Sequence, residues 1–127
     1  AVPAPTVRFH DTKNPDHLNI AAHDSSGISL ETAQWLVEQN GAMMIGSDTS
    51  GLEYGPAEKD GAAYRAKYQS FNPVHHYLLL EQGIHIGEFH FLEDLARDRV
   101  YEFCYFAATN KIKGAAAGFT MRPVAIR

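Results

Sequence analysis

The chain has 127 residues, of which 45% are hydrophobic and 20% are charged, and its formal net charge is −4. This composition is typical of one folded domain and excludes a chain kept unfolded by its own charge. Lysine and arginine are scattered without a run, and no stretch approaches the roughly 20 consecutive apolar residues that a bilayer span requires. We therefore expect neither nucleic acid nor a membrane as a partner.

The first 28 residues hold three prolines and many short polar residues, and they show no helical or strand period. We interpret residues 1–28 as an irregular N-terminal arm and residues 29–127 as the folded part. Ala1-Val2-Pro3-Ala4-Pro5 has neither an initiator Met nor a signal-peptide pattern, which indicates a processing or cleavage site, or trimming. The compartment stays unknown, with secretion as one option.

A first helix is predicted to begin after Ser29, whose hydroxyl suits an N-cap, and to end at Asn40-Gly41. Residues 42–46 follow at once as a short apolar run that ends in glycine, and they are interpreted as a buried strand. Residues 47–51 are polar and predict a loop, in which Asp48 fits an Asx turn better than a functional site.

The rest of the chain alternates between predicted loops, short helices and strands. In chain order we expect a long loop over 52–71 with one helical turn near 62–68, a helix from Pro73 to about residue 82, a strand over 84–88, a short helix over 92–96, a long aromatic strand over 100–108, a turn at 111–114, and a last strand over 122–126. Helices alternating with strands indicate an α/β domain with a mixed sheet and short helices.

Two adjacent histidines, His75 and His76, stand just after the predicted helix start. A neutral imidazole at a helix end can ligate a divalent metal through a ring nitrogen. Adjacent residues on a helix point about 100° apart, so only one of the two can face a given site. The competing interpretation is that the pair lies at the surface or caps the helix.

Glu88 ends an apolar strand, and His90 follows two residues later. If the strand continues that far, both side chains point to one face of the sheet. They would then form a pair of metal ligands, or a carboxylate that orients an imidazole. A solvent-exposed polar strand end is the equally weighted alternative.

Cys104 is the only cysteine and lies in the aromatic run Phe103-Cys104-Tyr105-Phe106. We expect it to be buried as a small inert hydrophobe, and we reject it as a nucleophile. The chain cannot form an internal disulfide, so its stability has to come from packing.

Several short motifs together resemble one enzyme family. They are glycine-bounded apolar strands, a Pro-Val-His helix start, a strand that ends in glutamate and a final Arg-Pro strand: Gly41, Gly46-Ser47-Asp48-Thr49, Asn72-Pro73-Val74-His75, Leu78-Leu79, Gly83-Ile84, Ile86, Glu88, Leu92-Glu93, Leu95, Ile112, Gly114 and Arg122-Pro123-Val124-Ala125. This order resembles the cyclase family of metal-dependent hydrolases, which includes kynurenine formamidase and isatin hydrolase. The resemblance runs from about residue 28 to residue 127 and covers only the C-terminal half of the family's domain.

The resemblance implies a swivelling β/β/α half-domain and a divalent metal, Zn²⁺ or Mn²⁺. In the family the metal is held chiefly by a His-x-Gly-Thr-His-x-Asp motif in the N-terminal half, and that motif is absent here. Further ligands, carried over, are Glu88 and either His75 or His76. His75 lies eight and His76 seven residues before Gly83, and each distance matches one family spacing; the Pro-Val-His context favours His75.

Two functional hypotheses follow from this resemblance. The first is a subunit or processed half of a hydrolase that opens an amide, lactam or lactone bond of a small-molecule substrate. It needs a second polypeptide chain, from the same precursor or complex, that carries the main metal motif; His90, or whichever of His75 and His76 is not a ligand, would move the proton to the leaving group. The second is a non-catalytic binding or scaffold protein with the same fold. Both predict an oligomer.

Overall fold

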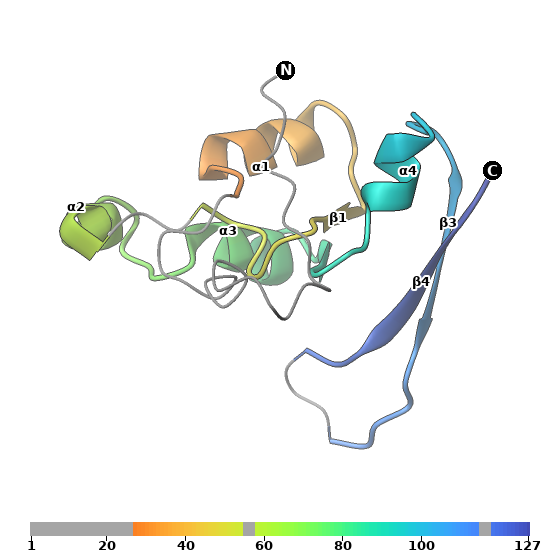
Figure 1. Ribbon diagram of the computed structural model, residues 1–127. Helices are drawn as coiled ribbons and strands as arrows, with labels where there is room; N and C mark the ends of the chain where they lie inside the picture. Colours follow the sequence, from red (N-terminus) through yellow and green to blue (C-terminus); the bar gives the residue numbers. More distant parts are fainter. Residues whose placement is uncertain (1–26, 55–57, 115–117) are drawn as a thin grey trace, which may run out of the picture. The chain divides into compact units, whose positions relative to one another are not determined.

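The computed structural model describes residues 27–54, 58–114 and 118–127 (Figure 1). The predicted irregular arm therefore lies outside the described residues except for its last two. The chain divides into two compact units, one that ends at Phe91 and one that spans Leu92–Arg127. Each unit is described by itself.

The first unit contains helices and one small sheet, and the second contains a short helix and a hairpin. The elements of the first unit are α1 (Leu30–Glu38), β1 (Met44–Gly46), α2 (Glu58–Tyr68), α3 (Pro73–His75), the π-helix η2 (His76–Glu81) and β2 (His85–Gly87). Those of the second are α4 (Glu93–Arg97), β3 (Cys104–Thr109) and β4 (Met121–Ile126). None of the described helices has the length and apolar character needed to cross a membrane.

Helix α1 begins as the sequence predicts. The Ser29 hydroxyl accepts a hydrogen bond from the Thr32 backbone N–H at 3.2 Å, which satisfies one of the free donors of the first turn. The helix ends at Glu38, and Gly41 then takes a positive φ of 64° that turns the chain toward β1. Ala33 faces the core and is fully buried.

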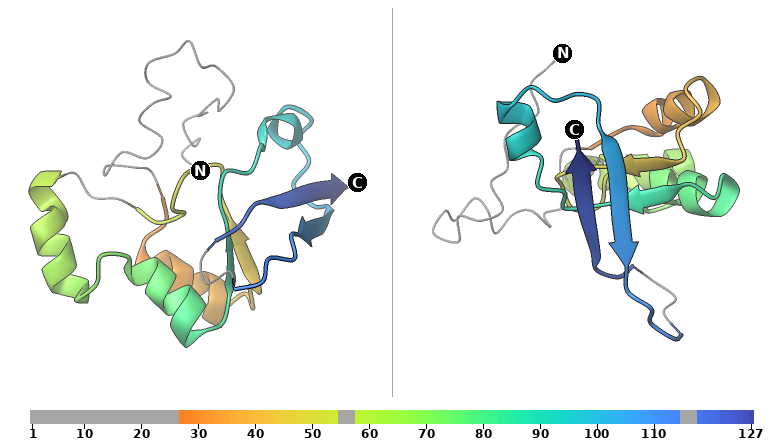
Figure 2. Two further views of the ribbon diagram at one scale, coloured as in Figure 1. Left: turned by 90° about the horizontal axis from the view of Figure 1, so that it is seen from below. Right: turned by 90° about the vertical axis from the view of Figure 1, so that its right-hand side faces the viewer.

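Strands β1 and β2 form a parallel pair, with Ile45 opposite Ile86 (Figure 2). The prediction of a buried strand over residues 42–46 is only partly right, because Ile45 is buried while Met43 is 81% exposed. The sheet consists of this single pair within the described residues, so it offers little surface to cover the flanking positions.

The helix predicted from Pro73 is present but changes its geometry after one turn. Pro73 occupies the first turn, where the missing N–H costs nothing. From His76 the chain continues as the π-helix η2, which is wider than an α-helix. Val74 and Leu78 are fully buried and form the centre of a small core with Ala33, Ile45, Leu52 and Tyr77.

Helix α2 is longer than the single turn that the sequence predicts. It ends at Tyr68, and the side chains of Lys67 and Tyr68 both reach Glu31 on α1, at 3.4 Å and 3.0 Å. The pKa of Glu31 is lowered to about 2, chiefly by a hydrogen bond from the backbone N–H of Glu31 itself, and further by the side chains of Tyr68, Ser29 and Lys67.

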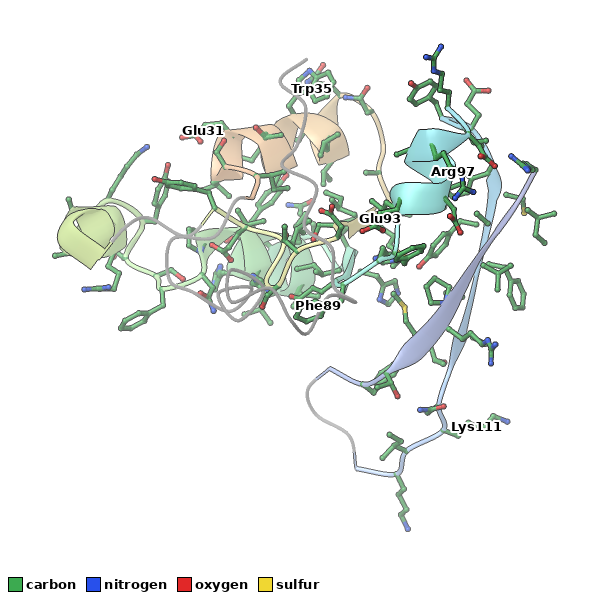
Figure 3. The ribbon with its side chains drawn as sticks, viewed as in Figure 1. Glu31, Trp35, Phe89, Glu93, Arg97 and Lys111 are labelled. Atoms are coloured by element: carbon green, nitrogen blue, oxygen red, sulfur yellow. The ribbon has the colours of Figure 1, made fainter. Side chains whose placement is uncertain are left out.

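The second unit is an antiparallel hairpin preceded by α4. Cys104 pairs with Ile126 and Thr109 with Met121. Arg97 lies on α4 (Figure 3) and forms ion pairs with Asp94 and Asp98. No described residue of this unit is buried. The prediction that Cys104 is buried is therefore wrong: Cys104 is exposed although its strand is rich in aromatic residues.

The described chain thus has both helices and small sheets, as the sequence predicts for an α/β class. The predicted single mixed sheet is instead two separate pairs of strands, one parallel and one antiparallel, within the described residues. The sequence places every one of these strands within a few residues of its observed position.

Candidate functional site

A buried glutamate marks the start of the candidate site. Glu53 is 7% exposed and lies where the chain forms a parallel bridge with Ile28. Its carboxylate accepts hydrogen bonds from the backbone N–H groups of Val74 at 3.5 Å and His75 at 3.2 Å. These donors belong to the first turn of α3, where Asn72 provides no side-chain cap. Glu53 therefore caps the helix from 22 residues away in sequence.

The same carboxylate also holds the ring of His75. Nδ1 of His75 lies 2.5 Å from Oε2 of Glu53, and Nε2 on the opposite side of the ring lies 3.3 Å from Oε1 of Glu88. The side chains of His75 and Glu88 are 26% and 31% exposed, whereas that of Glu53 is 8% exposed. One imidazole thus joins a buried carboxylate to a partly accessible one.

The two carboxylates set the charge state of the imidazole. The hydrogen bond that His75 donates to Glu53 is the largest effect and raises the pKa of His75, partial burial opposes it, and Glu88 adds a smaller rise. In the metal-free chain a proton on His75 is therefore favoured, because both ring nitrogens can then donate to carboxylate oxygens.

The neighbouring histidine has a different environment. Nδ1 of His76 lies 3.0 Å from Oε1 of Glu81 within η2, and both side chains are more than half exposed. The structure therefore brings His75, and not His76, together with Glu88. This pairing bears on which of the two histidines is a ligand, a choice that the sequence leaves open.

His90 lies in a separate, tight environment. Its ring Nδ1 is 3.3 Å from the Ser47 carbonyl oxygen, and its backbone N–H donates to the same oxygen at 2.9 Å. A Cβ atom added to Gly46 would lie 3.2 Å from Cε1 of His90, so glycine leaves the room that this ring occupies. The structure holds His90 against the end of β1.

The predicted Glu88 and His90 pair on one strand face is not formed. Strand β2 ends at Gly87, and Phe89 takes a positive φ of 57°, which breaks the alternation of side chains that the prediction requires. Glu88 consequently reaches His75, while His90 contacts the chain at Ser47.

The separation of His75 Nε2 and Glu88 Oε1 fits one edge of a tetrahedral metal site. Ligand distances of about 2.0–2.2 Å to zinc place two tetrahedral ligands roughly 3.3–3.5 Å apart, and the observed separation is 3.3 Å. In the part of the chain that the structure describes, however, no three His, Cys, Asp or Glu side chains are arranged to hold a metal ion. Glu53 is turned to the opposite side of the imidazole.

Sequence reasoning missed Glu53 altogether. It lies in the segment over residues 52–71 that shows no strand or helix period, and its partners are 21 and 22 residues further on. No local pattern distinguishes it from a surface glutamate.

Comparisons of the chain with protein-family models, with curated proteins and with solved structures gave no match. What the chain does therefore has to be inferred from the geometry around His75, together with the motifs in its sequence.

Proposed function

We propose that this chain supplies part of a divalent-metal site in a hydrolase of the cyclase type, which opens an amide, lactam or lactone bond. The observation that carries the proposal is the imidazole of His75 held between buried Glu53 and accessible Glu88. A metal-bound histidine usually donates a hydrogen bond from one ring N–H to a carboxylate while its other ring nitrogen binds the metal.

Each of the three residues then has a distinct task. Glu53 accepts a hydrogen bond from Nδ1–H of His75, which fixes the tautomer and leaves the Nε2 lone pair for the metal. Glu88 supplies a carboxylate oxygen beside Nε2, at a separation that suits two ligands of one Zn²⁺ or Mn²⁺ ion. His76 has no part in this arrangement, since its ring contacts Glu81 at the surface.

The two proposed ligands do not complete a catalytic site, because catalytic zinc usually has three protein ligands and an open position. We assign the remaining ligands to a second polypeptide chain, in line with the missing His-x-Gly-Thr-His-x-Asp motif. A bound divalent ion would supply polarisation of the substrate's carbonyl and a lower pKa for a bound water molecule. His75 and Glu88 hold and orient the ion from this side.

A scaffold protein with the same fold is the second candidate. The same three residues support this candidate if no metal binds. A protonated His75 between two carboxylates is then a complete network of ion pairs, which connects α3 to Glu53 and to Glu88 just after β2. On this reading the network serves stability alone, and a metal would have to displace a favoured proton.

Native mass spectrometry of the assembly purified from its source, with metal analysis, separates the two candidates. The hydrolase predicts a second chain and a stoichiometric divalent ion. A Glu88→Gln variant should lose at least tenfold in metal affinity with its circular dichroism unchanged, because it replaces a ligand oxygen that is partly accessible.

Glu81→Gln is the matched control, since Glu81 contacts the other histidine and is 52% exposed. It should leave metal binding unchanged. A metal-free native assembly, or equal metal affinity in both variants, would favour the scaffold.

A further inference from the structure

Both carboxylates that flank His75 adjoin a residue with an uncommon backbone conformation. Leu52 comes directly before Glu53 and has a φ of 54°. Phe89 comes directly after Glu88 and has a φ of 57°. A positive φ is uncommon in residues other than glycine, and it persists where the surrounding structure holds it, often at a functional site. The contacts around Phe89 therefore bear on how Glu88 is placed.

The hydrogen bonds just beyond β2 form a β-bulge. Continued by one residue, the register of β1 and β2 places Ser47 opposite Glu88. In a regular parallel pair the Ser47 carbonyl would then accept a hydrogen bond from the N–H of Phe89. It accepts one instead from the N–H of His90 at 2.9 Å, while the N–H of Phe89 donates to the Thr49 carbonyl at 3.2 Å. Two residues thus lie opposite one, an arrangement that is common beside active sites.

Ser47 holds the chain on both sides of Glu88. Its N–H donates to the Gly87 carbonyl at 2.9 Å, and its own carbonyl accepts from the His90 N–H. The ring of His90 adds a second hydrogen bond to that carbonyl, from Nδ1 at 3.3 Å. Because His90 is only 7% exposed, this ring is enclosed by the protein. The backbone of Glu88 is therefore fixed from the residue before it and from the bulge after it.

The room for the His90 ring depends on Gly46. A Cβ atom at this position would lie 3.2 Å from Cε1 of the ring, which is tighter than nearly all real contacts of a Cβ atom. Alanine at position 46 would therefore displace the ring from the Ser47 carbonyl.

We propose that His90 is a positioning residue, which fixes the bulge after β2 and so holds the carboxylate of Glu88 beside Nε2 of His75. Side chains two residues apart on a strand share a face, so Glu88 lies on the face of Ile86, which packs against the core. The strand itself ends at Gly87, and the bonds of His90 to Ser47 keep that direction beyond its end. This role differs from the proton transfer that the sequence indicates for His90, since the ring is buried. Its consequence for metal binding rests on the proposed function, whereas its consequence for the contact of Glu88 with His75 does not.

NMR of the metal-free full chain, with ¹⁵N-labelled histidine, tests the proposal without a metal. The Nε2 resonance of His75 reports the contact with Glu88, and the Nδ1 resonance reports the contact with Glu53. His90→Leu removes the ring donor but keeps a side chain that suits a buried position. It should shift Nε2 in the same direction as Glu88→Gln does and leave Nδ1 in place. His90→Asn, whose side-chain N–H can replace Nδ1–H, should leave both resonances in place.

Gly46→Ala tests the same contact by a second route, which matters if His90→Leu fails to fold. By displacing the ring it should give the same shift of Nε2. Gly118→Ala is the matched control, because a Cβ atom added there meets nothing within 4 Å, and it should give no shift. Circular dichroism checks that each variant folds.

Titration of the native assembly with Zn²⁺ alone measures the consequence for metal binding. His90→Leu should weaken binding about tenfold or more. Because it acts through Glu88, the loss in the double variant with Glu88→Gln should be smaller than the sum of the two single losses. An unshifted Nε2 resonance in both His90→Leu and Gly46→Ala, or additive losses, would overturn the proposal. An assembly that binds no Zn²⁺ would refute the proposed function instead, and the NMR comparison would still decide the role of His90.

Discussion

The unit that ends at Phe91 and the unit from Leu92 onward illustrate two ways in which apolar residues are used. In the first unit, apolar side chains of α1, η2 and β1 pack against one another. Leu78 and Val74 are fully buried from solvent there. In the second, the chain is richer in aromatic residues, yet no described residue is buried. Apolar content alone therefore does not make a core. Elements must also present their apolar faces to one another.

The two units also differ in how deeply their polar interactions are buried. The first unit holds a non-local contact between buried Glu53 and His75. The ion pairs among the described residues of the second unit join exposed or partly exposed side chains, such as Arg127 and Asp98 at 2.8 Å. Exposed pairs are screened by water and salt and contribute little, whereas a buried hydrogen-bonded carboxylate is costly to disturb. The expected effects of mutations follow this order.

The largest effect is expected at the centre of the core. Leu78→Ala removes a fully buried side chain and should lower the free energy of unfolding by about 2–5 kcal/mol. Urea denaturation measures this loss. Leu80→Ala in the same π-helix is the control, because Leu80 is 74% exposed and its truncation should cost less than about 0.5 kcal/mol. Equal losses would mean that the core does not lie where the structure places it.

Glu53→Gln should have the next largest effect. The variant keeps the shape of the side chain but loses the charge that accepts hydrogen bonds from Val74, His75 and the His75 ring. A hydrogen bond to a charged group contributes about 1.5–3 kcal/mol, and a loss of this size is expected in urea denaturation of the metal-free chain. Glu88→Gln should cost less because Glu88 is more exposed. The reverse order would contradict the assignment of Glu53 as the buried anchor.

The metal-free chain should also show a pH dependence that originates at His75. Its pKa is raised above the ordinary value of 6.5, chiefly by Glu53, so protonation stabilises the folded state. This stabilisation is fully present below pH 6.5 and is lost as the pH rises through the higher pKa of the folded chain. Urea midpoints between about pH 5.5 and about pH 8.5 should therefore fall in the wild type, and the fall should be smaller in Glu53→Gln. An unchanged slope in the variant would exclude Glu53 as the cause.

The smallest effect is expected at the ion pair of Asp98 with Arg127. Arg127 is the main cause of the lowered pKa of Asp98, so Arg127→Ala should raise that pKa toward 3.8, as NMR titration can measure. The stabilisation from the lowered pKa is present above 3.8 and is lost as the pH falls through the folded value. High salt should reduce the difference between wild type and variant, because this pair is exposed.

How far the sequence predicts the structure depends on the range of the interactions involved. Ser29 and Pro73 are local signals for helix starts, and both helices begin where these residues predict. Cys104 shows where local signals fail. Aromatic neighbours in the sequence lead to burial only if another element packs on the strand, and Cys104 is exposed. The same reasoning explains why the strand positions are well predicted but their assembly into two separate sheets is not.

The residues of the candidate site also differ in how far the sequence predicts them. The pattern in the sequence selects His75, His76 and Glu88 as polar residues at the ends of apolar elements, and the structure brings His75 and Glu88 into contact. It favours His75 over His76 only slightly, through the Pro-Val-His context, because the choice depends on how the helix is wound. It cannot find Glu53, whose only distinction is a partner 22 residues away.

The π-helix η2 has a consequence for how such chains diverge in evolution. A π-helical turn holds one residue more than the α-helical turn it replaces, and here it lies between His75 and Gly83. Deleting one residue within His76–Glu81 would restore an ordinary helix and shorten the distance from histidine to glycine from eight residues to seven. Insertions and deletions should accumulate in η2 rather than in helix α3 before it or strand β2 after it.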